Sequence, residues 1–92
     1  MPKFLVEVSH GETQVACAEA IDCFFKTGSH YFTHADWGCL DGVHKGWIIV
    51  EVDSRDEARA IVPPIFRSQA KIVQLNAFSQ DQLAEILRHH QP

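Results

Sequence analysis

The sequence of 92 residues predicts one α+β domain built on an antiparallel sheet. The first observation is an Asp-Gly pair at positions 41–42, between two runs rich in β-forming residues, which is typical of a hairpin loop. The second is a helix-start signal at Ser54–Glu57, directly after that hairpin. The third is the alternation of residue types in the runs 3–9 and 70–78. Together they predict the order βαββαβ, followed by a C-terminal helix, in a single domain over residues 1–92.

The N-terminal part is expected to hold a strand and a helix. Alternate side chains of the strand 3–9 point to opposite faces. The helix is expected over residues 12–26, where apolar residues recur every three to four positions, and Gly28 is its expected end. Its start is either a capping box over residues 9–12 or a cap at Thr13.

The Asp41-Gly42 loop fixes the pairing within a hairpin that spans residues 30–53. Asp36 then faces Trp47, and His34 faces Ile49. Alternation places a mixture of aromatic and ionisable residues on one face, namely His30, Phe32, His34, Asp36, Trp47, Ile49 and Glu51. A plain hydrophobic core would avoid such a mixture, so we expect the functional site on this face.

The C-terminal half is expected to hold a helix, a strand and a final helix. The helix that opens at Ser54 cannot continue through Pro63-Pro64, because proline lacks the amide donor and clashes with the preceding turn. Residues 65–67 are expected to form a short further turn. The last strand is expected over residues 70–78, and the final helix starts with the sequence Ser79–Gln82.

This order matches the ferredoxin-like split-βαβ unit, whose helices cover one face of the sheet. Right-handed crossovers would place the first and third strands side by side at the centre. The uncovered face is then expected to carry Leu5, Glu7, Phe32, His34, Trp47, Ile49, Glu51, Ile72 and Gln74. So many apolar groups should not remain in water, which predicts a homodimer formed through this face.

The segment SRDEARAIVPPIFRSQAKIVQL resembles the second half of muconolactone isomerase-like members of the dimeric α+β barrel superfamily. In both, a capped helix breaks at prolines before a strand of alternating apolar residues. The resemblance implies a homodimer with facing sheets and a pocket between sheet and helices or inside the barrel. The short chain also resembles small nickel-binding proteins of ferredoxin-like fold. Neither resemblance aligns a catalytic residue with this sequence.

Composition narrows the classes of function. A net charge of −4 argues against nucleic acid as a partner. No apolar run approaches the roughly 20 residues of a membrane span, and the N-terminus lacks the features of a signal peptide. Three cysteines without tight spacing argue against a disulfide framework and for the reducing cytoplasm.

The leading hypothesis is acid–base chemistry on an unsaturated, carbonyl-bearing metabolite, which would be isomerised, cyclised or simply bound. Glu51 or Glu7 would be the general base, since neighbouring carboxylates raise one pKa, and His34 would be the acid or electrophilic partner. The ligand would lie among Phe32, Trp47, Ile49, Gln74 and Arg67. No phosphate loop or dinucleotide fingerprint is present, so no nucleotide cofactor is predicted. Flavin or haem stays open, because dimeric barrels can hold either without a local motif.

The alternative hypothesis is a divalent metal site, and the third is a dimeric structural module without chemistry. His30, His34 and Asp36 alternate along one predicted strand, but the two histidines would lie roughly 13 Å apart. His34 with Asp36, or with Glu51, is easier geometrically and would suit zinc, nickel or iron. Separately, Cys39 facing His44 beside the turn could be an activated thiol, since an imidazolium lowers a thiol's pKa.

Overall fold

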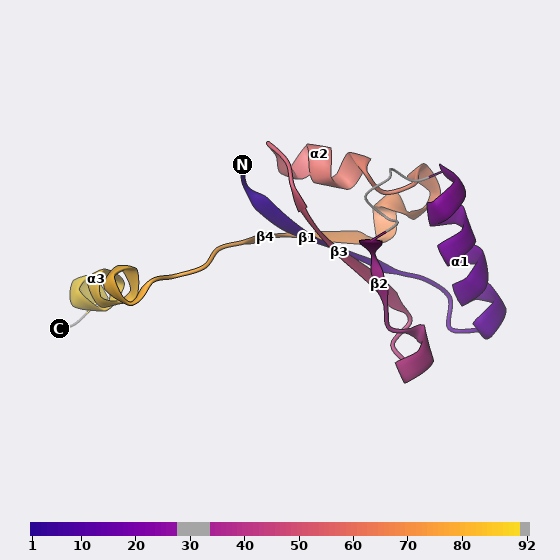
Figure 1. Cartoon of the computed structure of the whole chain (residues 1–92), viewed down its shortest axis with the longest axis horizontal. Coiled ribbons are helices and arrows are strands. Elements are labelled where there is room, and N and C mark those ends of the chain that lie inside the picture. Colours follow the sequence, from indigo (N-terminus) through magenta and orange to yellow (C-terminus); the bar gives the residue numbers. More distant parts are fainter. Residues whose placement is uncertain (28–33, 91–92) are drawn as a thin grey trace.

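The computed structural model describes residues 1–27 and 34–90 of the chain. They form an α+β fold with a four-stranded antiparallel sheet (Figure 1). The elements in chain order are β1 (Lys3–Ser9), α1 (Gln14–Thr27), β2 (Asp36–Trp37), the 3-10 turn η2 (Cys39–Asp41), β3 (Lys45–Glu51), α2 (Arg55–Ala60), the 3-10 turn η3 (Pro64–Gln69), β4 (Ala70–Leu75) and α3 (Gln80–His90).

The strand order in the sheet is β2-β3-β1-β4, with every neighbouring pair antiparallel. The first and third strands therefore lie side by side at the centre, as the sequence predicts. Figure 1 shows α1 and α2 on one side of the sheet, whereas α3 stands apart at the end of an extended linker. The folded part thus has one covered and one open sheet face.

The core lies between the sheet and the helices. Alternate residues of the central strands enter it, because period-two alternation sends every second side chain to the same face. Phe24 of α1 is 2% exposed and packs against Trp37 and Phe66, with both ring-centroid distances 5.2 Å. The buried cluster consists of Phe4, Val6, Val8, Phe24, Ile48, Val50, Val52, Ala58, Ile61, Val62, Ala70 and Ile72.

Short polar side chains start the helices. Ser54 Oγ accepts from the backbone N–H of Glu57 at 3.1 Å, and Ser79 Oγ accepts from that of Gln82 at 3.0 Å, so both predicted caps are confirmed. At α1 the cap is Thr13, whose hydroxyl accepts from the N–H of Ala16 at 3.0 Å. The alternative start, a capping box over residues 9–12, is wrong.

The predicted hairpin register is correct, but its shape differs. Asp36 pairs with Trp47, as expected, yet β2 contains only two residues. The turn is also wider than a two-residue loop, because η2 bends the chain before Gly42, whose φ of 80° needs a residue without a Cβ. His34 is exposed and lies outside β2, so its predicted pairing with Ile49 is wrong.

The face assignment of β4 is also wrong by one residue. Val73 lies opposite Leu5 on β1, so the open face carries Val73 together with its alternate neighbours on β4. Ile72 lies opposite Val6 and is 5% exposed, inside the core. Gln74 shares the parity of Ile72 and not that of the open face. Both alternating sets of this strand mix apolar and polar residues, so the pattern alone did not decide the register.

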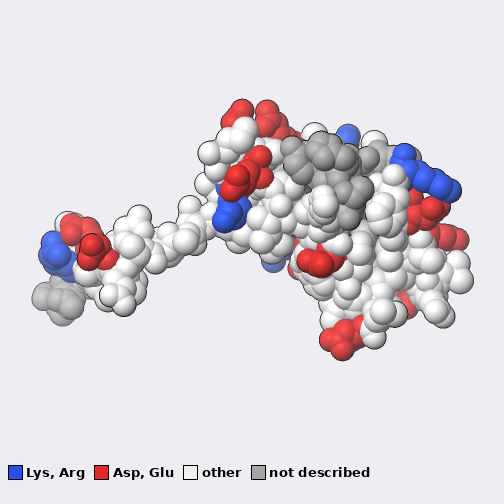
Figure 2. Space-filling model, viewed as in Figure 1, with Lys and Arg blue, Asp and Glu red and all other residues white. Residues whose placement is uncertain are grey.

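Charged groups are dispersed over the surface. On the face in Figure 2, blue and red side chains are interspersed, and the described residues visible there form no continuous basic area. Of the helices within residues 1–27 and 34–90, none combines the length and hydropathy that a transmembrane segment needs.

Candidate functional site

The two glutamates proposed as general bases lie far apart. Glu7 pairs with Trp47, whereas Glu51 pairs with Lys3 near the other end of the same strands. Four positions along a strand correspond to roughly 13 Å. The expectation that these carboxylates share one site is therefore wrong, because the β1–β3 register separates them.

Glu7 is held in its ionised form. The Trp47 indole N–H donates to Glu7 Oε1 at 2.9 Å, and Lys45 Nζ lies 3.6 Å from Oε2. The indole hydrogen bond, with smaller contributions from Lys45 and Lys71, outweighs desolvation and holds the pKa of Glu7 below its usual range. A carboxylate of lowered pKa is a weaker base, so this environment opposes the role predicted from the sequence.

Of the remaining predicted residues that the structure describes, Ile49 and Gln74 line one depression, and none of the others lines it. His30 and Phe32 lie outside the described residues. His34 and Asp36 are exposed, and Ile49 is 57% exposed on the open face. The Arg67 guanidinium is occupied by backbone carbonyls: Nε donates to the oxygen of Val62 at 2.8 Å and Nη2 to that of Ala60 at 3.0 Å.

A different set of side chains converges where β1 ends and β3 begins. The backbone N–H of His10 donates to the backbone carbonyl of His44 at 3.2 Å, which extends the β1–β3 ladder by one step and brings the two imidazoles close to each other. Their ring centroids are 5.8 Å apart. Cys39 reaches the same place from η2. One potential ligand atom of each of these three residues lies within 4.8 Å of the others.

Two glycines allow the loops to close around this cluster. A Cβ on Gly38 would lie 2.7 Å from the Val43 carbonyl oxygen and 2.8 Å from the Trp47 ring. A Cβ on Gly11 would lie 2.8 Å from that of Ala16. Gly38 thus lets η2 bring Cys39 toward β1, and Gly11 lets the chain turn from His10 directly into α1.

The tautomer of His10 is set by its neighbours. Nδ1 lies 2.9 Å from the Gly11 carbonyl oxygen, which can only accept, so Nδ1 carries a proton. In the neutral ring, Nε2 then presents its lone pair to Cys39 Sγ, 3.2 Å away. Histidine ligands of metals are commonly oriented in this way, with the other ring nitrogen bound to a backbone carbonyl. The Trp37 ring flanks His10 at a centroid distance of 6.0 Å.

His44 carries an unsatisfied nitrogen. Its Nδ1 is buried and has no hydrogen-bond partner among the described residues. A buried polar atom without a partner costs about 1–3 kcal/mol, so such atoms are rare unless they serve a ligand. His44, which carries this nitrogen, belongs to the cluster of three residues.

The structure contains a disulfide between Cys17 of α1 and Cys39, with a Cα–Cα distance of 6.7 Å. The cysteine spacing argued against a disulfide framework, but the fold brings together two cysteines 22 residues apart, and they form one disulfide. In this state Cys39 has no thiol, so the predicted Cys39–His44 thiol pair is absent. The third cysteine, Cys23, takes no part in a disulfide.

Sequence reasoning identified Cys39 and His44 as neighbours but missed His10 and the contribution of Cys17. His10 is the first residue after an alternating strand and stands beside Gly11. With the first and third strands predicted as neighbours, a histidine at the end of one and a histidine at the start of the other was the available signal. It needed the register between these strands, which the turn does not supply.

Comparison with known proteins found no matching family model, no matching curated protein and no matching solved structure. The resemblance to the dimeric α+β barrel superfamily therefore remains a prediction. Function must be argued from the geometry of the chain itself.

Proposed function

We propose that the protein binds one divalent transition-metal ion, zinc in the first place, through His10, Cys39 and His44 once Cys39 is in its thiol form. The observation that carries this proposal is the convergence of the three ligand atoms within 4.8 Å. Tetrahedral zinc with bonds of about 2.3 Å to sulfur and 2.0–2.1 Å to nitrogen separates neighbouring ligands by roughly 3.6 Å. Small side-chain rotations would bring the three atoms to these positions.

The chemistry of the ligands favours zinc over calcium or magnesium. Thiolate and imidazole are borderline to soft ligands, whereas calcium and magnesium require oxygen. A cation would also give a partner to Nε2 of His10, whose lone pair faces the Cys39 sulfur, and it would lie beside His44, whose Nδ1 has no hydrogen-bond partner among the described residues. The metal hypothesis from the sequence is thus retained with a different set of ligands.

Acid–base catalysis on the open face has less support. It needs a carboxylate of ordinary or raised pKa near a histidine, whereas Glu7 has a lowered pKa and His34 is exposed outside the sheet. Metal binding requires no such group. It accounts for the unsatisfied nitrogen of His44, which acid–base catalysis does not explain.

The test is metal titration of the reduced, untagged protein. Wild type should bind one zinc ion per chain, and cobalt at the same site should show the charge-transfer band of a thiolate ligand. His10→Ala and His44→Ala should each weaken binding by at least about 100-fold, since even changes outside the coordination shell cost 10–100-fold. His89→Ala is the matched control, because that histidine pairs with Glu85 on the exposed helix α3.

An unchanged zinc affinity in both His10→Ala and His44→Ala would contradict the proposal. So would a reduced wild-type protein that binds no zinc. If His34→Ala alone removed the metal, the site would be the one first predicted from the sequence.

A second proposal concerns the fold and assembly, namely a ferredoxin-like homodimer in which the open sheet faces meet. The strand order supports the ferredoxin-like arrangement. Ile49 is more than half exposed at the centre of the open face, beside the half-buried Leu5 and Val73. α3 has a further apolar surface, made of Phe78, Leu83, Ile86 and Leu87, each at least 42% exposed. Two unpartnered apolar surfaces on one small chain favour association.

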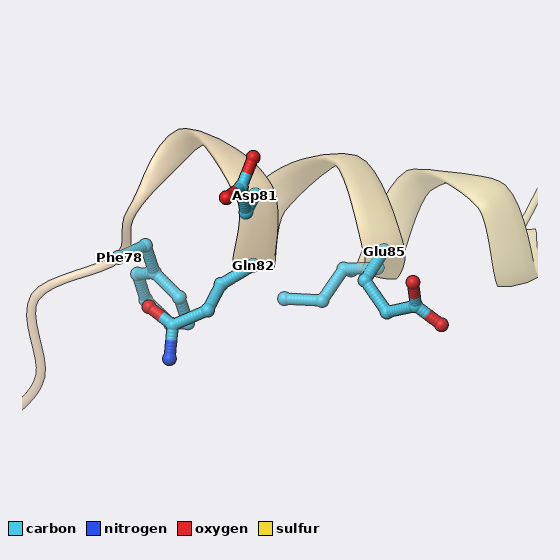
Figure 3. Close-up of a pocket in the computed structure, with 5 residues that line it drawn as sticks. Phe78, Asp81, Gln82 and Glu85 are labelled. Atoms are coloured by element: carbon cyan, nitrogen blue, oxygen red, sulfur yellow. The ribbon is translucent and has the colours of Figure 1, made fainter.

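α3 has the form of an arm that could hold the second copy. It follows the extended residues 76–79 and forms no part of the buried core. Figure 3 shows Phe78, Asp81, Gln82 and Glu85 at a depression on its surface, which Ile86 also lines. In the proposed dimer this side of α3 packs on the partner, because an isolated helix of 11 residues is marginal in water without such contacts.

Sedimentation equilibrium tests the dimer. Wild type should sediment with twice the chain mass, Ile49→Asp should be monomeric, and removal of residues 79–92 should weaken association. Val15→Asp is the matched control, since Val15 is 65% exposed on α1, the helix that covers the opposite face of the sheet. A monomeric wild-type protein at high concentration would contradict the proposal.

A further inference from the structure

Cys17 lies one bond from the candidate metal cluster. It is in the first turns of α1, is 7% exposed, and its sulfur is joined to that of Cys39. Reduction of this bond would leave two thiols where one disulfide stood. Cys39 would lie beside His10 and His44, with which it forms the cluster, and Cys17 would lie next to Cys39 at the edge of that cluster, because α1 and η2 fix the backbone positions of the two cysteines.

We propose that Cys17 is the fourth ligand, so that zinc and the Cys17–Cys39 disulfide are alternative occupants of one redox-controlled site. The proposal rests on the proposed metal binding by His10, Cys39 and His44. The dithiol form would hold zinc in a Cys₂His₂ set, and the disulfide form would hold none. The choice between them is made by thiol–disulfide exchange.

The two states exclude each other because they use the same sulfur electrons. A zinc-bound thiolate donates a lone pair to the metal, whereas a disulfide sulfur shares that electron pair with its partner and is a poor ligand. The histidines alone would leave two ligands, fewer than the three or four that protein zinc sites use. We therefore expect oxidation to release the zinc ion completely, and not only to lower the affinity of the site.

A low-molecular-weight disulfide such as oxidised glutathione is the oxidant, and it accepts the electrons that the two cysteines lose. One cysteine thiolate attacks the glutathione disulfide, a mixed disulfide forms, and one glutathione thiolate leaves. The second cysteine thiolate then attacks the mixed disulfide, forming the Cys17–Cys39 bond and releasing the second glutathione thiolate. Two electrons pass from the protein to the oxidant, and Zn²⁺ leaves with its charge unchanged. A reducing dithiol and zinc reverse the sequence.

Four protein ligands would also define the type of site. Catalytic zinc keeps a position open for water or substrate, whereas structural sites are closed by four protein side chains. Here the two sulfurs and two imidazoles would complete the tetrahedron. They connect α1, η2, the end of β1 and the start of β3. In the reduced state the metal would hold all four together, whereas in the oxidised state the disulfide joins only α1 and η2.

The experiment starts from reduced, zinc-loaded protein and adds oxidised glutathione. Released zinc is followed with a chromogenic chelator, and the protein is followed by native mass spectrometry. One zinc ion should be released for each disulfide formed, with the same time course. No molecule should carry both the disulfide and zinc. Cys23→Ser should behave like wild type, because that residue contributes to neither state.

Cys17→Ser separates the two proposals. It should still bind zinc through His10, Cys39 and His44, but at least about 10-fold more weakly. Oxidised glutathione should give a glutathione adduct on Cys39 in place of an internal disulfide. If Cys17→Ser bound zinc as tightly as wild type, or if wild type carried zinc and the disulfide together, Cys17 would not be a ligand and the redox control would fail. Metal binding by the other three residues would then still stand. If reduced wild type bound no zinc at all, both proposals would fail.

Discussion

The Cys17–Cys39 disulfide predicts a measurable stability difference between three states of the same chain. The cross-link closes a segment of 22 residues. Loss of chain entropy in the unfolded state then corresponds to about 3 kcal/mol at 25 °C. Reduction without metal should remove this contribution, which lowers the melting temperature by about 12–24 °C for a domain of this size.

Zinc should restore most of the stability that reduction removes. A ligand that binds only the folded state stabilises it by about 4 kcal/mol when its free concentration is 1,000 times Kd. We therefore expect oxidised protein and reduced, zinc-loaded protein to unfold at similar urea concentrations, and reduced protein with a chelator to unfold well below both. Circular dichroism follows the helices, and tryptophan fluorescence follows Trp37 and Trp47.

Two variants control this measurement. Cys23→Ser should reproduce all three transitions, whereas Cys17→Ser should lack the oxidised state. Equal stability of reduced protein with and without zinc would contradict the proposed metal binding, because it would show that no ion binds the folded form preferentially. Equal stability of the oxidised and reduced, metal-free forms would refute the account of the cross-link.

Further perturbations test other parts of the structure. Trp47→Phe removes the donor to Glu7 and should cost about 1.5–3 kcal/mol of stability, with a rise in the Glu7 pKa visible by carboxyl NMR titration. Because the pKa of Glu7 is lowered in the folded protein, its contribution is present at neutral pH and lost as the pH falls through the folded-state pKa; Glu7→Gln should flatten this acid dependence of the unfolding free energy. Gly38→Ala should clash with the neighbouring carbonyl, lower stability by at least about 1 kcal/mol and weaken zinc binding, whereas Leu40→Ala on the exposed tip of the turn should do neither. Arg67→Met should cost about 1–3 kcal/mol, because its guanidinium holds two backbone carbonyls, and should leave zinc binding unchanged.

Local signals in the sequence predicted most of the fold. The caps at Ser54 and Ser79 and the break at Pro63-Pro64 act on the adjacent residues, so their effects can be inferred without the rest of the chain. The Asp41-Gly42 pair correctly predicted which residues of β2 and β3 face each other, because the wider loop is still centred on these two positions. The predicted order of helices and strands followed from these local signals.

Contacts between distant segments could not be predicted in the same way. The face of β4 depended on its register with β1, and its own alternation was ambiguous. The candidate site required three such relations at once: the β1–β3 register that joins His10 to His44, the η2 turn that carries Cys39, and the docking of α1 that brings Cys17. The sequence shows which residue types are present, but the proximity of these four side chains depends on packing between distant segments.

X-ray absorption spectroscopy of the reduced, zinc-loaded chain would identify the atoms bound to the metal. We expect one zinc ion per chain in a four-coordinate shell of two sulfurs at about 2.3 Å and two imidazole nitrogens at about 2.0–2.1 Å. Loss of one nitrogen in His10→Ala and in His44→Ala would assign the ligands. A shell dominated by oxygen, or the wild-type spectrum in both histidine variants, would contradict the proposed site.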